Sequence, residues 1–288
     1  MSVLPIAATI PDTVVFDLAP ASGGAPWRIF LYQPPGEAPE EGWPVLYYTD
    51  ANAVAGTAAD IVRVQAAWPL GTGIGYGVMV GIGYPVEGAY DPLRRSWDLG
   101  PPPGKSYPPF TPDGPEARTG GADEFLAFIE DELKPEIARR ARINPARQAL
   151  LGHSFGGLFV LHTLFRKPDA FADWISASPA IWWEGGGIVD AAEAFIASGA
   201  SCTGRILTIA GEYEQKLAPF QMGATDEQKR LTNFDESRIV DNARIMAERL
   251  TQVPGLKSEY AFVPGETHMS IMPAVMNLAI RFAFALER

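Results

Sequence analysis

Short apolar runs alternate with longer helical patterns along most of this chain, and this alternation restricts its fold more than any other feature. Residues 43–50 and 76–84 are rich in β-branched and aromatic side chains, which is typical of strands buried on both faces. A helical pattern over 54–68 lies between them. Further strands are expected at 148–153, 171–178, 205–212 and 257–265, and further helices at 124–142, 156–166, 188–197, 236–250 and 271–286. Regular alternation of this kind predicts an α/β fold, with a mostly parallel central sheet sandwiched between helices.

The first strands of the chain follow a different pattern. Residues 13–19 and 27–33 alternate apolar and polar side chains, as half-buried antiparallel strands do. Nothing in the composition changes along the chain in a way that would mark a linker. We therefore expect residues 1–288 to form a single domain.

Composition excludes several classes of partner. A formal net charge of −11 argues against nucleic acid or an anionic membrane surface as the main partner. The N-terminal residues lack the basic segment of a signal peptide, and no apolar run approaches the ~20 residues of a membrane-spanning helix. The only cysteine, Cys202, cannot form an internal disulfide, which fits a reducing, cytoplasmic location. The sequence does not set the oligomeric state.

Two segments match neither a strand nor a helix. Residues 84–121 contain nine prolines, and residues 214–235 are polar and mixed. Long structureless segments inside a compact domain are usually functional loops. We expect both to lie at the same end of the sheet, around the mouth of a pocket.

Gly152–Gly156 forms a G-x-S-x-G motif centred on Ser154. The motif is short enough to occur by chance, but here it follows an apolar strand and opens an apolar helix. That setting is the one a nucleophile elbow requires, and the alternative is an ordinary turn between strand and helix. Glycines on either side of the serine allow the sharp turn, so the motif predicts a nucleophilic serine at position 154.

Only three histidines could activate this serine. His153 is its neighbour, and on a tight turn its side chain should point away and pack against the elbow. His162 lies eight residues further along the predicted helix, about 12 Å along its axis, and is interpreted as a core histidine. His268 follows the last strand, where the order Ser, acid, His of an α/β-hydrolase places the base. We therefore predict that His268 is the general base.

The acid should follow the strand at 205–212. Glu214 is the first choice, because a carboxylate there could accept the proton of His268 Nδ1 and fix its tautomer. Glu212 is the alternative, and Asp226 and Asp235 are more distant candidates.

An oxyanion site needs two backbone donors. One is expected from Phe155, directly after the serine, and the other from the amide of Asn52, after the strand at 43–50. Histidine and cysteine are too sparse and too far apart to suggest a metal site, and no cofactor is expected.

These residues resemble those of a known family. Residues 47–52 (YYTDAN), 152–157 (GHSFGG) and 176–183 (SASPAIWW) are similar to motifs of the esterase D-like branch of the α/β-hydrolases, particularly the siderophore trilactone esterases. Residues 94–99 (RRSWDL) resemble that family's arginine-rich stretch. Two positions depart from the family pattern: Ala51 stands in place of a glycine and Ala180 in place of a serine.

The resemblance implies an α/β-hydrolase fold and a cofactor-free serine esterase that acts on a small-molecule ester, with a pocket under the proline-rich segment. A polyanionic substrate of this kind would need a local positive patch, and Arg94, Arg95 and Arg63 are the substrate-binding candidates for it; the alternative is that they are ordinary surface arginines. Trp182 and Trp183 either form the floor of the substrate-binding pocket or simply pack. The hypothesis is a serine carboxylic-ester hydrolase that works through an acyl-enzyme on a siderophore-like trilactone or related ester. Two alternatives are an acyltransferase that uses the same site and a non-catalytic ligand-binding protein of this fold.

Overall fold

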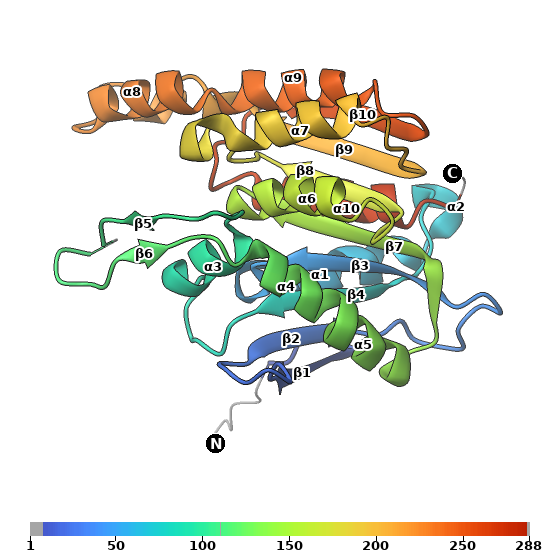
Figure 1. Ribbon diagram of the computed structural model, residues 1–288. Coiled ribbons are helices and arrows are strands. Elements are labelled where there is room, and N and C mark those ends of the chain that lie inside the picture. The colour runs from blue at the N-terminus through green and yellow to red at the C-terminus, as the bar shows by residue number, and fades with distance from the viewer. Residues whose placement is uncertain (1–7, 110, 287–288) are drawn as a thin grey trace, which may run out of the picture.

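The computed structural model describes residues 8–109 and 111–286, which are arranged around one large β-sheet (Figure 1). The ends of the predicted domain, residues 1–7 and 287–288, and residue 110 of the proline-rich segment lie outside the described residues. The sheet has eight strands in the order β1-β2-β4-β3-β7-β8-β9-β10. Their bounds are β1 Thr13–Leu18, β2 Trp27–Tyr32, β3 Trp43–Thr49, β4 Val78–Gly83, β7 Ile143–His153, β8 Asp173–Ala177, β9 Gly204–Gly211 and β10 Leu256–Val263.

The strand directions follow the sequence patterns. Both pairings made by β2, with β1 and with β4, are antiparallel, and the remaining pairings of this eight-stranded sheet are parallel. In the parallel part, β4 and β8 are buried along their whole length, as continuous apolar runs predict. The predicted mostly parallel α/β sheet is confirmed.

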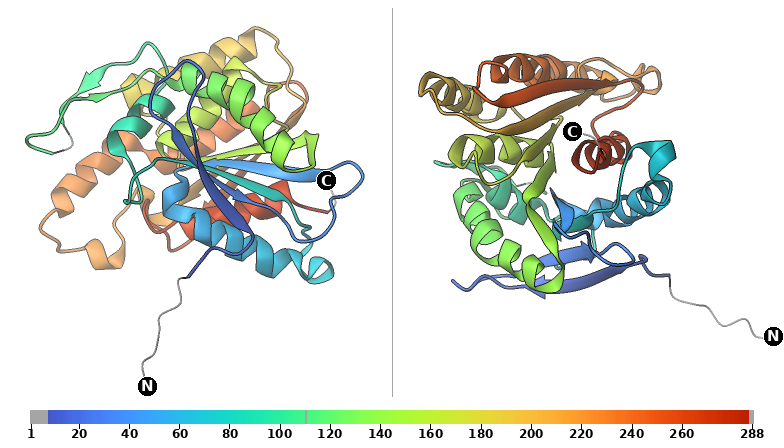
Figure 2. Two further views of the ribbon diagram at one scale, coloured as in Figure 1. Left: turned by 90° about the horizontal axis from the view of Figure 1, so that it is seen from below. Right: turned by 90° about the vertical axis from the view of Figure 1, so that its right-hand side faces the viewer.

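Helices cover both faces of the sheet, as Figure 2 shows in its right-hand view. One face carries α1 (Ala51–Ala66) and α10 (Met272–Ala283), which pack on each other. The other face carries α4 (Ala122–Phe128), α5 (Lys134–Arg140), α6 (Phe155–Arg166), α7 (Gly187–Ala197) and α9 (Ile239–Leu250). A short helix α2 (Pro69–Thr72) follows α1. Among the described residues, no helix has both the length and the apolar character needed to cross a membrane.

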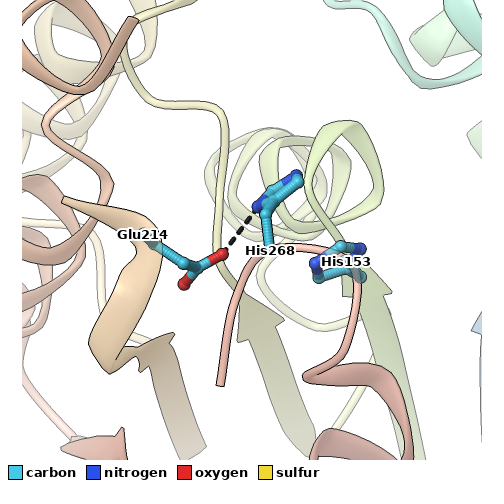
Figure 3. A group of neighbouring side chains, drawn as sticks. All are labelled: His153, Glu214 and His268. Atoms are coloured by element: carbon cyan, nitrogen blue, oxygen red, sulfur yellow. Dashed lines mark hydrogen bonds and ion pairs between the residues drawn. The ribbon is translucent and has the colours of Figure 1, made fainter. Parts of the chain in front are cut away.

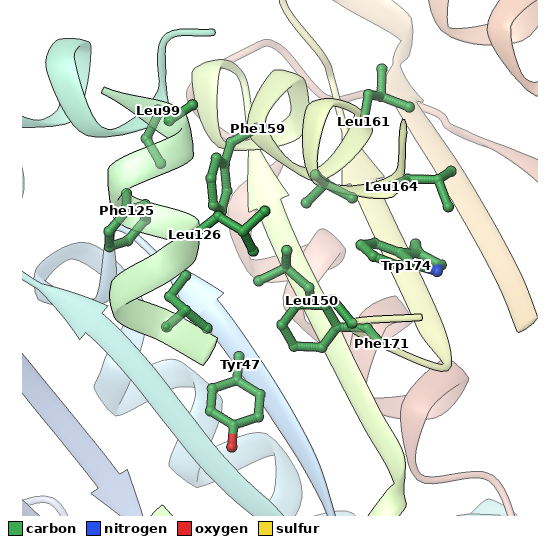
Figure 4. Close-up of a cluster of buried hydrophobic side chains, with 14 of the residues drawn as sticks. Tyr47, Leu99, Phe125, Leu126, Leu150, Phe159, Leu161, Leu164, Phe171 and Trp174 are labelled. Atoms are coloured by element: carbon green, nitrogen blue, oxygen red, sulfur yellow. The ribbon is translucent and has the colours of Figure 1, made fainter. Parts of the chain in front are cut away.

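The larger core lies between the sheet and the α4–α6 layer. Trp174, Phe159 and Tyr47 are fully buried there (Figure 4). Trp27 of β2 stacks on Phe128 of α4, with ring centroids 4.0 Å apart. This packing fixes α6, and with it the serine that precedes α6, against the sheet.

The helix expected over 124–142 is interrupted. A π-helical turn, η1 (Ile129–Leu133), separates α4 from α5. Pro135, the second residue of α5, has no amide to donate to the preceding turn, and a local widening of the helix accommodates a missing bond of this kind.

Both segments expected to be structureless contain regular elements, so that expectation was wrong. Residues 84–121 include helix α3 (Pro92–Leu99) and the short strands β5 (Ser106–Tyr107) and β6 (Ala117–Arg118). Helix α3 begins with an ordinary cap, since Asp91 Oδ1 accepts from the Arg94 amide at 3.1 Å. Residues 214–235 include most of helix α8 (Glu227–Ser237) and the short 3₁₀ turn η4 (Pro219–Gln221), and another 3₁₀ turn, η3 (Glu212–Glu214), ends at the first residue of the segment.

Candidate active site

Ser154 occupies a sharp turn between β7 and α6. Its backbone has φ 59° and ψ −115°, which L-residues rarely adopt, and its amide donates to Ala177 O at 2.9 Å. A Cβ at position 152 would overlap the backbone carbonyl of Gly156, so only glycine fits there. The strained turn at Ser154 places its hydroxyl beyond the end of the sheet.

His268 lies between Ser154 and an acid. Its Nε2 is 3.0 Å from Ser154 Oγ, and its Nδ1 is 2.6 Å from Glu214 Oε1. Figure 3 shows Glu214 and His268 joined in this way. The three side chains come from β7–α6, η3 and the loop after β10, which the parallel strand order brings to one edge of the sheet.

Glu214 is almost fully buried, at 1% exposure. Its second oxygen, Oε2, accepts from Ser178 Oγ at 2.9 Å and from the Gly211 amide at 2.6 Å. A buried carboxylate needs such donors to remain charged. Both oxygens of Glu214 are therefore used, one to orient His268 and one to hold the carboxylate itself.

Ser178 was not singled out as a site residue by the sequence analysis. It follows β8, which pairs with β7 beside the elbow, and its own backbone has a positive φ of 44°. The only sequence signal was its position in the 176–183 motif, where it immediately precedes a proline.

The other candidate acids lie apart from His268. Glu212 accepts from Lys216 Nζ and from the Gly265 amide, both at 2.8 Å, and these bonds lower its pKa. Asp226 pairs with Arg230, and Asp235 is exposed on α8. Of the four carboxylates considered, the structure brings only Glu214 to His268.

His153 packs beside the site instead of acting within the chain of hydrogen bonds. Its ring lies 4.6 Å from the ring of His268 and is buried (Figure 3). Burial, and then the nearby His268 and Arg95, hold the pKa of His153 well below its usual value. A neutral ring therefore supports one side of His268. The third histidine, His162, is buried in α6 and lies 2.8 Å from Asp123 Oδ1.

His153, Glu214 and His268 also have donor atoms within 4.8 Å of one another, a spacing that could hold a metal ion. However, both nitrogens of His268 already face hydrogen-bond partners, Glu214 and Ser154. A metal ion would have to displace those partners. The arrangement suits proton transfer better than metal binding.

The two residues predicted to supply oxyanion donors both stand at helix N-termini. Phe155 is the first residue of α6 and Asn52 the second residue of α1, so neither amide has a partner within its own helix. The Asn52 side chain is fixed elsewhere: its Oδ1 accepts from the Tyr84 amide at 2.8 Å, and its Nδ2 donates to the carbonyl oxygens of Tyr84 and Val86. Ala51, one of the two departures from the family pattern, is fully buried at the start of α1.

The adjacent arginines of α3 have different surroundings. Arg95 forms two hydrogen bonds of 2.9 Å with the carboxylate of Asp50 and lines a cavity at Ser154. Arg94 points away, donating from Nη1 to Pro26 O at 2.6 Å and lying over the ring of Trp27. The structure thus does not bring Arg94 to the cavities at Ser154. Arg63 is on α1, paired with Asp60.

Two cavities meet at Ser154 and His268. The α3 cavity has a volume of about 230 Å³, and the α8 cavity about 340 Å³. The α3 cavity is lined by residues of the proline-rich segment, the elbow and the loop that carries His268, namely Tyr90, Pro92, Arg95, Ser96, Phe155 and Met269. The α8 cavity is lined by residues that follow β8 and by residues at the α8–α9 junction, namely Ser178, Ala180, Trp182, Asn233, Phe234 and Ile239. The segments 84–121 and 214–235 therefore each supply part of the wall of a cavity beside the serine.

The paired tryptophans have separate positions. Trp182 lines the α8 cavity and is 39% exposed. Trp183 lies behind the elbow, with its ring edge-on to Phe155 at 4.6 Å and tilted against Tyr107 at 4.5 Å. Trp183 lines a third cavity, of about 540 Å³, in which Ser154 takes no part.

A mostly parallel sheet, a strand–serine–helix elbow and the chain order serine, acid, histidine together define a serine hydrolase of the α/β-hydrolase fold. The model of the Esterase family, described as "Putative esterase", matches residues 21–268. The chain therefore belongs to the Esterase family, a family of carboxylic-ester hydrolases, as its motifs predicted.

Named relatives and solved structures agree with this assignment. The chain is 38% identical to the ferri-bacillibactin esterase BesA of Bacillus subtilis, over 96% of this chain and 91% of the relative. It is 34% identical to the siderophore enterobactin esterase of Emericella nidulans, over 86% and 84% of the two chains. The BES protein from Bacillus cereus superposes with a TM-score of 0.82 at 31% identity, covering 99% of both chains. The siderophore hydrolase EstA from Aspergillus nidulans gives a TM-score of 0.82 at 30% identity, over 98% of this chain and 97% of the other.

Proposed function

We propose that this protein hydrolyses the ester bonds of trilactone siderophores through an acyl-enzyme on Ser154. The observation that carries the proposal is the continuous chain from Ser154 Oγ through His268 to the buried Glu214, at 3.0 and 2.6 Å. Relatives that are 34–38% identical over most of the chain are named as esterases of bacillibactin and enterobactin, which supports the choice of substrate.

The first half of the reaction forms the acyl-enzyme. His268 Nε2 removes the proton of Ser154 as Oγ attacks the ester carbonyl, and Glu214 stabilises the imidazolium that results. The negative charge on the former carbonyl oxygen is stabilised by the amides of Asn52 and Phe155. When the tetrahedral intermediate collapses, the bond between the carbonyl carbon and the ester oxygen breaks. His268 returns its proton to the departing alkoxide.

The second half repeats these steps with water. His268 removes a proton from water, the hydroxide attacks the acyl carbon, and the bond to Ser154 Oγ breaks as His268 reprotonates the serine. The products are a carboxylic acid and an alcohol. In a cyclic triester both groups stay on one molecule after the first cut, and the ring becomes a linear chain.

The two cavities support an extended substrate. An ester bond at Ser154 has one part of the molecule on its acyl side and another on its alcohol side, and the structure has a cavity on either side of the serine. A macrocycle that continues in both directions from the bond being cut would fill both of them. We also propose a cytoplasmic location, because the only cysteine is a buried free thiol.

The test compares the native protein with the variant Ser154→Ala. The control is Ser198→Ala, which replaces a serine at the C-terminal end of α7. Ferric and metal-free bacillibactin and enterobactin are the substrates, and mass spectrometry follows ring opening. We expect a fluorophosphonate adduct on the native protein and on Ser198→Ala, but none on Ser154→Ala. Ring opening should likewise be lost in Ser154→Ala alone. Ring opening retained by Ser154→Ala would refute the proposed mechanism. A native protein that forms the adduct but opens neither ring would refute the substrate class. Accumulation of ester-exchange product with added alcohols would favour an acyltransferase.

A further inference from the structure

Asp50 stands at the N-cap of α1 but does not cap the helix. An aspartate at this position usually has an extended backbone, and its carboxylate accepts from the second or third amide of the helix. Here the backbone of Asp50 is left-handed, with φ 58° and ψ 36°, and its side chain makes no capping hydrogen bond. The first-turn amides of α1, including that of Asn52, are left without a carboxylate partner.

Arg95 holds the Asp50 carboxylate instead. Nε and Nη2 of Arg95 bind the two carboxylate oxygens, each at 2.9 Å. The side chains are 15% and 3% exposed, so solvent competes little for this pair. Two parallel charge-assisted bonds also fix orientation, which a single bond would not do.

The same guanidinium contacts the other side of the proposed oxyanion site. It lies over the ring of Phe155 at 5.7 Å and over the ring of Tyr90 at 5.5 Å. Phe155 is the residue after the nucleophile, and Asp50 lies two residues before Asn52. Arg95 therefore touches both of the segments that would supply an oxyanion donor.

From this geometry we infer that Arg95 is a positioning residue, which keeps the oxyanion site open by drawing the Asp50 carboxylate away from the first turn of α1. The inference rests on the proposed esterase function. Without Arg95, the carboxylate would be free to accept from the first-turn amides of α1. It would then occupy the donors, and place a negative charge where the oxyanion develops.

Arg94 offers a matched control on the same helix. It is also a partly buried arginine that stacks on aromatic rings, lying 5.0 Å from the ring of Trp27 and 5.1 Å from that of Tyr84. Its side-chain partners are Pro26, Asp98 and the rings of Trp27 and Tyr84, not Asp50 or Phe155, and it lines neither cavity at Ser154. Replacing it removes the same charge from α3 without freeing the Asp50 carboxylate.

The experiment measures kcat and KM of a chromogenic ester for Arg95→Met, Asp50→Asn, the double variant and Arg94→Met. Asparagine is chosen because it tolerates the left-handed backbone at position 50. The double variant removes both charges, so that neither is left buried without its partner if a single variant folds poorly. Circular dichroism checks the fold of each protein.

We expect kcat of Arg95→Met to fall about 100-fold, the size of effect seen when one oxyanion donor is lost, with KM changed less than about threefold. Because Arg95 acts through Asp50, the double variant should be no slower than the slower single variant. Arg94→Met should retain the native kcat.

Three outcomes would overturn the inference. The first is a raised KM with kcat intact in Arg95→Met, which would assign Arg95 to substrate binding. The others are a loss of kcat in the double variant equal to the product of the two single losses, and a loss of kcat in Arg94→Met as large as in Arg95→Met. A native protein that hydrolyses no ester would instead overturn the proposed function on which the inference rests.

Discussion

Replacing Glu214 by glutamine should block the reaction by reversing the tautomer of His268. Oε2 of Glu214 accepts from the Gly211 amide at 2.6 Å, and a backbone amide can only donate. The side-chain oxygen of the glutamine must therefore occupy the Oε2 position, where Ser178 also donates. The NH₂ group is then left at the Oε1 position, 2.6 Å from His268 Nδ1 in the native protein.

An NH₂ group at that place donates to Nδ1, so the imidazole proton moves to Nε2. Nε2 then has no lone pair for the proton of Ser154, although every heavy atom keeps its position. Loss of the correct tautomer lowers kcat by about 10⁴ in serine hydrolases that use a serine, a histidine and an acid in this way. That factor is equivalent to about 5.4 kcal/mol of transition-state stabilisation. Stability should change little, because both donors to Oε2 keep an acceptor.

The assay is kcat/KM for a p-nitrophenyl ester, with Glu212→Gln as the matched control two residues away. Glu212 is held by Lys216 and the Gly265 amide, away from His268, so its variant should stay within about twofold of the native rate. The reasoning fails if Glu214→Gln keeps more than a tenth of the native activity, or if Glu212→Gln loses as much as Glu214→Gln.

Three further outcomes are expected. Ser178→Ala removes one of the two donors to Glu214 Oε2 and should lower the free energy of unfolding by about 1.5–3 kcal/mol in urea titrations; an unchanged midpoint would contradict the buried bond. Burial raises the pKa of Asp98 to about 6 from 3.8, so the folded protein keeps a proton that the unfolded chain releases in this range. The contribution of Asp98 to stability should therefore fall by about 3 kcal/mol as the pH rises from about 3 to about 7, at 1.36 kcal/mol per pKa unit. The difference in urea midpoint between the native protein and Asp98→Asn should change accordingly, and a constant difference would show that the pKa is ordinary. Trp182→Ala should raise KM for a trilactone about three- to tenfold and leave KM for acetyl esters unchanged, whereas equal effects on both would remove Trp182 from the substrate wall.

The strands of the central sheet were predictable because each buried strand is a short continuous run of apolar residues in the sequence. β3, β4 and β8 each combine β-branched or aromatic residues over five to seven positions, bounded by polar or glycine residues. The strand order could not be read in the same way, since pairing joins segments that are far apart in the chain.

The missed helices lack the signals that reveal a core helix. α8 buries only Ser237, so no apolar stripe marks it, and its residues resemble a polar loop. α3 has a helix start in its sequence, Asp91 followed by Pro92, but the many prolines around it favoured a loop. Helices that cover a site instead of a core are therefore poorly marked by periodicity.

The identity of the reacting residues was more predictable from the sequence than the hydrogen-bond and ion-pair partners of the side chains around them. Ser154 and His268 were chosen from a local motif and from chain order, and the structure places them 3.0 Å apart. Arg94 and Arg95 are indistinguishable in sequence, but their partners, Pro26 and Asp50, are 68 and 45 residues away. No local pattern encodes such distances, and for the same reason the role of Ser178 beside Glu214 could not be inferred.

The two cavities at Ser154 also affect how specificity can change over evolutionary time. Residues of 90–96 contribute to one wall, and residues of 178–182 and 233–239 to the other, so a substitution or a length change in one stretch leaves the opposite wall intact. Relatives could therefore diverge in the alcohol they release while keeping the acid they retain, or the reverse. Exchange of either wall between relatives, with Arg95 and Ser178 kept, would recombine these preferences without altering the serine they share.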